Sequence, residues 1–139
     1  MITSLTYLST ASTPFDATRI AALLLQSRAN NERHGLTGML LYKKGRFMQV
    51  LEGADRDVRE RYAAISADPR HTDLKTLLDE SIEQRRFPQW SMGLPDPVDA
   101  DLRSAPGYES LFETPVGRFG IREDSSRAQL LLEWFRRKA

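Results

Sequence analysis

The chain has 139 residues, of which 40% are hydrophobic and 28% charged, and it contains no cysteine. This length and composition predict a single globular domain with a substantial core. The absence of cysteine excludes disulfides, thiol nucleophiles and thiolate metal sites. Twenty basic residues against nineteen acidic ones give a net charge of only +1, so no overall field favours nucleic acid or a membrane surface.

The N-terminal stretch MITSLTYLST has no basic flank followed by a long apolar run, so it does not predict a signal peptide. No apolar run in the sequence is long enough to span a bilayer. We therefore expect a cytoplasmic protein with no membrane partner.

Residues 2–9 alternate in polarity like a β-strand, with Tyr7 on one side of it. Residues 17–34 have helical spacing, and Asp16 just before them is a predicted N-cap. The inner face of this helix combines aliphatic and polar side chains: Ile20, Leu24, Ser27 and Asn31, with Leu23 and Asn30 beside them. Gly35 is expected to end the helix.

Two strands are predicted next, residues 36–42 and 45–53, and the short turn between them predicts a hairpin. In the second strand, Gln49 lies between Phe47 and Leu51 on one face. Both faces are largely apolar, so we expect the strand to be covered on both sides. A buried amide without partners costs roughly 1–3 kcal/mol. Gln49 is therefore expected either to bond to neighbouring backbone or to face something polar in the core.

Residues 55–67 have the spacing of a second helix, which is expected to end before Pro69. Residues 74–83 and 90–94 are predicted as two further strands. The order is βαββαβ plus a strand, which predicts a ferredoxin-like α+β fold with both helices on one face of the sheet.

The last part of the sequence differs in character. Residues 99–104 and 125–138 are predicted to be helical, the second with an apolar stripe through Leu131 and Leu132. We expect residues 1–97 to form one domain and residues 98–139 a helical extension to it, with a role in oligomerisation. The extension is expected to pack on the sheet face opposite the two helices, within one chain or in a dimer.

The predicted topology brings several polar groups to the face that carries Gln49. We expect the two helices to run parallel, so that the end of the second one lies near Asn30 and Asn31. The result is a slot between the helices that is mostly apolar, with a few polar groups, as small-molecule pockets usually are. Its expected lining comprises Tyr7, Ile20, Leu24, Ser27, Asn30, Asn31, Phe47, Gln49, Ile65, Asp68, Arg70 and His71.

Amide side chains carry both hydrogen-bond donors and an acceptor. They suit a planar ligand whose edge alternates C=O and N–H, such as a pyrimidine or the dioxopyrimidine ring of a flavin. They suit a metal poorly, because clustered carboxylates, thiolates and histidines are missing. No glycine-rich loop precedes a helix, so a phosphate cradle is not predicted.

Five runs of the sequence resemble the BLUF domain, the blue-light sensor that uses flavin. They are SLTYLS, SRANNERHGLTGMLLY, GRFMQVLEG, ISADPRH and QWSMGL. They occur in the family's order and spacing and cover roughly residues 2–95. Beyond residue 95 the family has no common motif.

The resemblance implies roles for individual residues. Tyr7 matches the photoactive tyrosine and Gln49 the glutamine that switches its hydrogen bonds. Asn30 and Asn31 match the pair that includes the amide holding the flavin ring. Trp90 and Met92 match two residues whose placement around the pocket changes with the light state. The positions that flank or contact the ring and the ribityl chain match Ile20, Leu24, Ile65, Asp68, Arg70 and His71.

The function that the resemblance implies is light sensing and not catalysis. Blue light moves an electron and a proton from Tyr7 by way of Gln49, and the rearranged hydrogen bonds shift the flavin spectrum reversibly to the red. The cofactor would be FAD, with FMN as a possibility. The signal would leave through Trp90, Met92 and the C-terminal helices. The expected partners are further copies of the chain and a separate protein, such as a phosphodiesterase or a transcription regulator.

Three other interpretations of the same residues remain. The chain could be a flavin-free interaction module that keeps the fold. It could be a small hydrolase that uses His71 with Asp68 or Asp73, although no nucleophile or oxyanion site accompanies them. The basic residues in 134–138 could bind nucleic acid, although they are more simply a complement to the helix dipole on a solvated face.

Overall fold

The computed structural model describes residues 1–13, 16–43, 45–87, 91–93 and 128–133. The chain divides into two compact units, Met1–Leu94 and Pro95–Ala139. No helix among the described residues is long and apolar enough to cross a membrane. Nor do the described residues include a cluster of His, Cys, Asp and Glu that could hold a metal ion.

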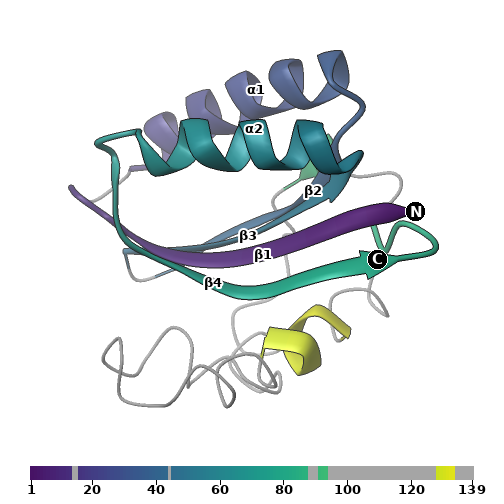
Figure 1. The fold of residues 1–139 in the computed structure, drawn as a ribbon. Helices are drawn as coiled ribbons and strands as arrows, with labels where there is room; N and C mark the ends of the chain where they lie inside the picture. The colour runs from purple at the N-terminus through teal and green to yellow at the C-terminus, as the bar shows by residue number, and fades with distance from the viewer. Residues whose placement is uncertain (14–15, 44, 88–90, 94–127, 134–139) are drawn as a thin grey trace. The chain divides into compact units, whose positions relative to one another are not determined.

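The first unit contains five strands and two helices (Figure 1). In chain order they are β1 (Ile2–Ala11), α1 (Ala17–Arg33), β2 (Thr37–Lys43), β3 (Arg46–Gly53), α2 (Asp55–Ser66), β4 (His71–Ile82) and β5 (Ser91–Gly93). Every element of the predicted βαββαβ order, with its additional strand, is present. The predicted ferredoxin-like α+β class is therefore confirmed.

The strands form one sheet in the order β4-β1-β3-β2-β5. β3 lies at the centre, between β1 and β2. β1 pairs antiparallel with both β3 and β4, while β2 and β3 form the predicted hairpin. β5 adds to the edge in parallel with β2, through Gly38 and Met39. Both helices cover one face of the sheet, side by side (Figure 1).

Local sequence signals explain where α1 begins and ends. Asp16 is its N-cap, and the carboxylate accepts a hydrogen bond of 2.8 Å from the backbone N–H of Arg19. After the helix, Gly35 has φ +65°, a conformation that glycine adopts without steric cost. The backbone C=O of Asn31 then accepts a 2.8 Å hydrogen bond from the N–H of Leu36, which directs the chain into β2.

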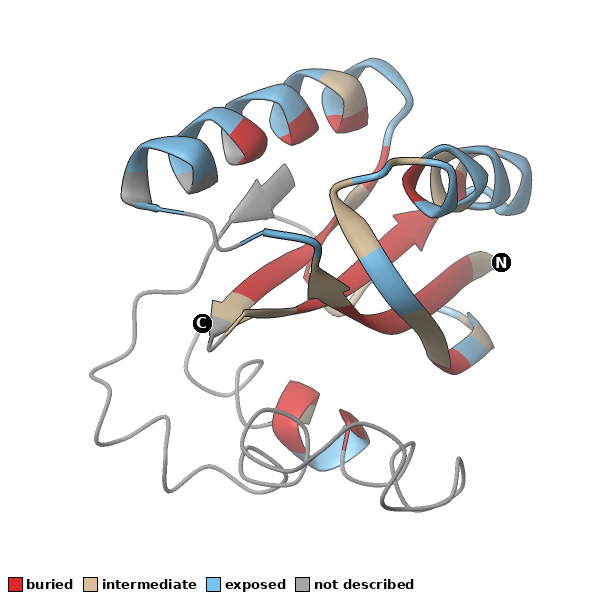
Figure 2. Ribbon diagram, turned by 90° about the vertical axis from the view of Figure 1, so that its left-hand side faces the viewer, coloured by how far each residue is buried: buried red, intermediate tan, exposed pale blue. Residues whose placement is uncertain are grey.

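The main core lies between the sheet and the two helices. Its buried side chains come from β1, α1, β2, β3, α2 and the turn before β2: Leu5, Tyr7, Leu23, Leu36, Leu40, Phe47, Leu51, Val58 and Ile65. Figure 2 shows the burial running along the strands, while the outward sides of the helices are exposed. Met48 and Val50, on the other face of β3, are also fully buried, so both faces of this strand are covered as predicted.

β4 begins earlier than its sequence predicts, at residue 71 instead of 74. Its pairing with β1 shifts register twice, between Thr6 and Tyr7 and between Leu8 and Thr10. Asp73, near the second shift, has φ +53°, which is uncommon for a non-glycine residue. These irregularities hide the two-residue alternation that sequence analysis depends on.

The predicted direction of the helices is wrong. β1 and β3 are antiparallel, and each is followed by a helix that doubles back over the sheet. α1 and α2 therefore lie side by side but run in opposite directions, as the colours in Figure 1 show. The predicted hairpin of β2 and β3 reverses the chain between the two helices, and parallel helices are incompatible with that reversal.

In the second unit, residues 128–133 are helical, within the predicted helix 125–138. Ala128, Leu131 and Leu132 are buried, and Leu130 is exposed. The predicted helix 99–104 and the rest of the predicted C-terminal helix lie outside the described residues. Packing of this extension on the sheet, and its role in output or oligomerisation, stay predictions.

Candidate functional site

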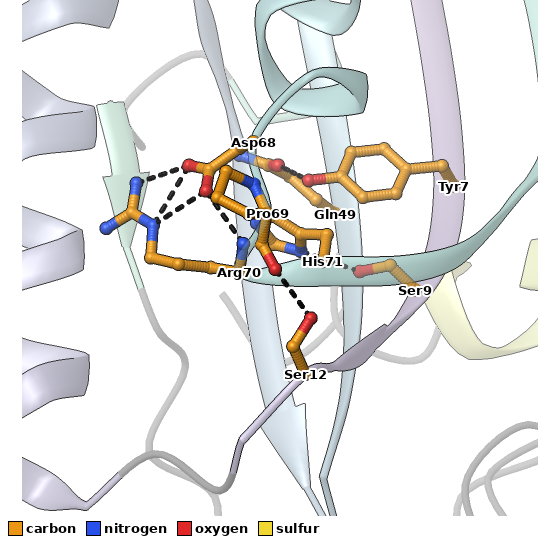
Figure 3. Close-up of polar contacts among 8 residues, drawn as sticks. All are labelled: Tyr7, Ser9, Ser12, Gln49, Asp68, Pro69, Arg70 and His71. Carbon is orange, nitrogen blue, oxygen red and sulfur yellow. Dashed lines mark hydrogen bonds and ion pairs between the residues drawn. The ribbon is translucent and has the colours of Figure 1, made fainter.

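Tyr7 and Gln49 face each other at the centre of the sheet. They are direct partners in the pairing of β1 with β3, so their side chains leave the sheet on the same face. The Tyr7 hydroxyl donates a hydrogen bond to Oε1 of Gln49 (Figure 3). Both side chains are buried. The phenol is therefore a polar partner of Gln49 within the core.

The surroundings of Tyr7 keep its phenol protonated. Burial raises the pKa of Tyr7 above its usual value, although the charge of Arg61 acts in the opposite direction. The ring of Tyr62, from α2, packs against it with 5.4 Å between centroids. Tyr62 is itself held by a 2.9 Å hydrogen bond between its hydroxyl and Oγ1 of Thr76. At neutral pH, Tyr7 is thus a neutral donor in a dry site.

Asn31, in the last turn of α1, has a fully buried side chain without a hydrogen-bond partner. Neither Nδ2 nor Oδ1 makes a hydrogen bond within the described part of the chain. Each unsatisfied buried group costs about 1–3 kcal/mol. Ser27, one turn earlier on α1, is also buried. An orphaned carboxamide of this kind indicates a binding group for a ligand with both donors and acceptors.

A small cavity lies beside Gln49, between the helices and the sheet. Its lining comes from α1, the hairpin strands β2 and β3, α2, the turn after α2 and the start of β4. The residues are Leu23, Ser27, Leu40, Gln49, Arg61, Ile65, Asp68, Arg70 and His71. It encloses about 20 Å³, the space of about one water molecule. Six of the predicted lining residues surround this space: Ser27, Gln49, Ile65, Asp68, Arg70 and His71.

The turn after α2 carries two of these residues, Asp68 and Arg70, and is held by several hydrogen bonds (Figure 3). The Arg70 guanidinium pairs with the Asp68 carboxylate at 2.6 Å, and this pairing lowers the pKa of Asp68. Ser12, beyond β1, donates a 2.6 Å hydrogen bond to the C=O of Pro69. These contacts attach the turn to the end of β1.

His71 begins β4 and contacts two residues of the core. Its Nδ1 lies 2.9 Å from Oγ of Ser9, and its ring centroid lies 4.9 Å from that of Phe47. Burial lowers the pKa of His71, and the Asp68 carboxylate opposes that shift. Phe47 is fully buried beneath it. The imidazole is thus neutral near pH 7.

The antiparallel helices separate Asn30 from the turn after α2. Asn30 lines a second cavity of about 150 Å³, together with His34 from the end of α1 and Glu60, Arg61 and Ala64 from the middle of α2. Asp68, Arg70 and His71 instead lie with Leu23 and Ser27, nearer the middle of α1. The predicted proximity of Asn30 to the end of α2 is therefore wrong.

Several predicted positions have no described side chain. Ile20 and Leu24 lie on α1, and Met92 lies in β5, but only their backbones are described. Trp90 lies outside the described residues. Their predicted roles stay predictions.

Sequence analysis missed three residues that line the cavity, Leu23, Leu40 and Arg61. Leu23 was placed beside the stripe of α1 and not in the pocket. Arg61 precedes Ile65 by four residues and so shares its helix face, a spacing that could have identified it. Leu40 pairs directly with Gln49 across the hairpin, which only the register reveals.

Comparison with known proteins identifies relatives of the chain. The model of a family described as BLUF, sensors of blue-light using FAD, matches residues 2–93. The photoactivated adenylate cyclase subunit beta of Euglena longa is 36% identical over 92 residues, which are 66% of this chain and 11% of that protein. The blue light- and temperature-regulated antirepressor BluF of Escherichia coli K12 is 33% identical over 130 residues, which are 93% of this chain and 32% of that protein.

Solved structures agree with the sequence relatives. The dark-state structure of BlrB, a BLUF protein, has a TM-score of 0.74 and 31% identity, and the match covers 96% of each chain. A bacterial light-regulated adenylyl cyclase has a TM-score of 0.64 and 38% identity over 68% of this chain and 27% of its own. The chain thus spans about a tenth of the cyclase subunit from Euglena and nearly the whole of BlrB.

Proposed function

The chain belongs to the BLUF family, the sensors of blue light using FAD, and we propose that it detects blue light through the buried Tyr7–Gln49 pair beside a bound flavin. The observation that carries this proposal is the combination of that hydrogen-bonded pair with the orphaned carboxamide of Asn31. Gln49 and Ser27 line the apolar cavity, and Asn31 follows Ser27 by one turn of α1. The proposed ligand would satisfy the Asn31 carboxamide.

The groups present fit a flavin ring. Asn31 offers donors and an acceptor to an edge that alternates C=O and N–H. Leu23, Leu40 and Ile65 supply apolar walls for the flat faces of the ring. Because the cavity encloses only about 20 Å³, the side chains at its mouth, Arg70 and His71 among them, must move outward as the ring enters.

A bound flavin supplies the absorption of blue light and an acceptor for one electron. Tyr7 is placed to give up that electron together with its phenolic proton, because burial disfavours a phenolate or any other charge left behind. Gln49 accepts the hydrogen bond from Tyr7 and lies between it and the cavity, so its amide is placed to relay the proton.

Rotation or tautomerisation of the Gln49 amide exchanges its donor and acceptor positions. When Tyr7 recovers its electron and proton, the amide is left with a new donor directed at the ligand. A new hydrogen bond to a ring carbonyl accounts for a small red shift. Exchange of one hydrogen bond in a dry site changes the free-energy difference between two states by about 1 kcal/mol. A difference of this size is enough to shift the populations of the two states.

The output belongs to the same proposal. The signal passes through Trp90, Met92 and the C-terminal helices to a partner protein, and the chain itself catalyses no reaction. Relatives carry names that refer to an adenylate cyclase and to an antirepressor, which supports signalling to an enzyme or a transcription regulator. A phosphodiesterase is an equally suitable partner class, and self-association accompanies the change. The cell compartment is proposed to be the cytoplasm.

FAD is the proposed cofactor, with FMN as an alternative, because the predicted contacts are mainly with the ring that both share. Release of the flavin from purified protein, followed by chromatographic identification, distinguishes the two.

The test is the visible absorption spectrum of the purified chain before and after blue light. We expect a flavin spectrum that shifts slightly to the red and recovers in darkness. Tyr7→Phe and Gln49→Ala should bind flavin and lose the reversible shift. Tyr62→Phe is the matched control, because its ring contacts Tyr7 but its hydroxyl bonds to Thr76 instead of Gln49. It should keep the shift.

A colourless protein that takes up neither FAD nor FMN would contradict the proposal. The chain would then be better described as a flavin-free interaction module with the same fold. A shift that persists in Tyr7→Phe would leave flavin binding intact and refute the role of Tyr7.

A further inference from the structure

A second buried polar cluster lies on β3, three residues after Gln49. The Glu52 carboxylate is fully buried at the end of this strand. Its Oε2 accepts a 2.8 Å hydrogen bond from the backbone N–H of Arg86. Its Oε1 accepts one of 3.0 Å from the N–H of Phe87 and one of 3.2 Å from Oγ1 of Thr37. One carboxylate thus joins β3, β2 and the segment 85–87.

Arg85 strengthens the same junction from the other side. Its guanidinium donates to Oγ1 of Thr37 at 2.8 Å, to the C=O of Glu52 at 3.0 Å and to the C=O of Gly35 at 2.8 Å. Phe87, next in the chain, is buried. The segment 85–87 is therefore fixed to the turn between α1 and β2 as well as to the end of β3.

The hydrogen bonds to Glu52 come from backbone amides and a hydroxyl, and the guanidinium of Arg85 contacts its backbone C=O. A buried carboxylate is costly to desolvate, and an apolar side chain of similar volume often gives equal or greater stability. Unlike an apolar group, a carboxylate makes directional hydrogen bonds. Each of its two oxygens fixes one backbone N–H group, that of Arg86 or that of Phe87.

The segment that Glu52 holds leads directly towards β5. β5 pairs with β2 and contacts α1, so it adjoins both elements that border the candidate site. Gln49 and Glu52 lie on opposite faces of β3, because they are an odd number of residues apart. Glu52 thus joins the strand that carries Gln49 to the chain before β5 without lying on the face of the candidate site.

We propose that Glu52 is a positioning residue that couples β3 to β5, so that the light-dependent change at Gln49 alters the segment 83–93. This inference rests on the proposed photoreceptor function. It assigns to Glu52 no contact with the flavin and no part in the photochemistry.

The test compares amide hydrogen exchange in darkness and under blue light, on the full chain loaded with flavin. In the wild type we expect a light-dependent difference across residues 83–93. Glu52→Gln is nearly isosteric, but it replaces an anionic acceptor with a neutral amide. In either orientation, the NH₂ group of that amide faces a backbone N–H, which cannot donate to it. It should keep the reversible red shift, exchange the amides of Arg86 and Phe87 on the order of tenfold faster in darkness, and lose the light-dependent difference.

Glu60→Gln is the matched control, because Glu60 is exposed on α2 and pairs with Arg56 four residues earlier. It should behave as the wild type in both measurements. Thr37→Val removes one donor to Glu52 and one acceptor of Arg85. It leaves the two backbone donors to Glu52, so a smaller loss of the difference is expected. It also serves as the test if Glu52→Gln does not fold.

The outcomes separate the two proposals. Without a red shift in the wild type, the photoreceptor function fails. The wild type could show the red shift while Glu52→Gln, or Thr37→Val as its substitute, keeps the light-dependent difference in amide exchange. That result would overturn the inference about Glu52 and leave the photoreceptor function intact. A uniform rise in exchange over all strands, with the difference retained, would likewise overturn it, because Glu52 would then contribute stability alone.

Discussion

At the residue scale, the site consists of buried polar groups whose partners lie on other elements. Tyr7 satisfies Gln49 across the β1–β3 pair. Asn31, near the end of α1, is buried with both polar atoms unsatisfied. The two amides therefore differ. Gln49 already belongs to a protein hydrogen bond, and under the proposed function Asn31 binds the ligand.

Substitution of Asn31 is expected to have opposite effects on the stability of the flavin-free chain and on its affinity for flavin. Replacing it by leucine, of similar size, removes two unsatisfied buried groups, so the flavin-free chain should be as stable as the wild type or more stable by about 1–3 kcal/mol. Flavin affinity should fall roughly tenfold or more, because the ring loses its hydrogen bonds. Urea unfolding of the flavin-free protein and titration with FAD measure the two effects.

Gln26→Leu is the control for this pair of measurements. Gln26 lies on the exposed side of α1, so the same change there should leave flavin affinity unaltered. Weaker binding together with a large loss of stability in Asn31→Leu would mean that Asn31 supports the fold and not the ligand.

At the scale of elements, the direction of the chain decides which residues meet. The β2–β3 hairpin reverses the chain, so α2 runs against α1 and brings Ile65 and Asp68 to the level of Leu23 and Ser27. The hairpin also holds Gln49 opposite Leu40 at the cavity wall. The site therefore depends on close and regular pairing of these two strands.

At Gly38 the backbone of β3 leaves no room for a side chain on β2. A Cβ at this position would lie 1.8 Å from the C=O oxygen of Val50, which is backbone and cannot move aside alone. Gly38→Ala should therefore force β2 from β3 and lower the free energy of unfolding by about 3 kcal/mol. Urea unfolding followed by circular dichroism measures this loss.

Gly45 provides the comparison. It has φ +78° in the hairpin turn, and a Cβ there would meet no atom within 4 Å. Gly45→Ala should cost only about 1–2 kcal/mol, for the left-handed conformation alone. Equal losses in the two variants would show that conformation, and not the close approach to Val50, limits Gly38.

At the scale of the whole molecule, the described charges are mostly exposed pairs, which contribute little to stability. Arg59 and Asp79 join α2 to β4 at 2.6 Å, with nearly half of each side chain exposed. His71 is different, because it is partly buried against Phe47 and this burial lowers the pKa of its imidazole. It therefore links the stability of the entire first unit to pH.

Acidification below about pH 6.5 should destabilise the flavin-free chain through His71. Burial holds its pKa below the unfolded value of about 6.5. Between the two values the unfolded chain binds more protons, so stability rises with pH and is lost as the pH falls through the folded pKa. One proton accounts for at most about 1.4 kcal/mol per pH unit.

Urea unfolding at pH 5.5, 6.5 and 7.5 measures this dependence. His71→Gln should flatten it. The chain has only one other histidine, His34, which is exposed at the end of α1, so His34→Gln should leave the dependence as in the wild type. Identical slopes for the wild type and His71→Gln would refute the assignment.

The sequence by itself determined the class of fold and the elements of the site. Alternation and helical spacing locate the strands and helices, because each depends on residues close together in the chain. The same spacing places Tyr7 and Gln49 on helix-facing sides of their strands, and it identifies Gln49 as a core amide in need of a partner. β4 begins three residues before its predicted start, because its bulges break the alternation.

Only the tertiary structure decided which predicted residues meet. The antiparallel helices, the pairing of Leu40 with Gln49 and the burial of Asn31 without a partner all follow from the register and order of the strands. Strand pairing joins residues far apart in the chain, and no local pattern encodes it. For the same reason, the junction of Glu52 with Arg85, Arg86 and Phe87 is visible in the fold and not in the spacing of its residues.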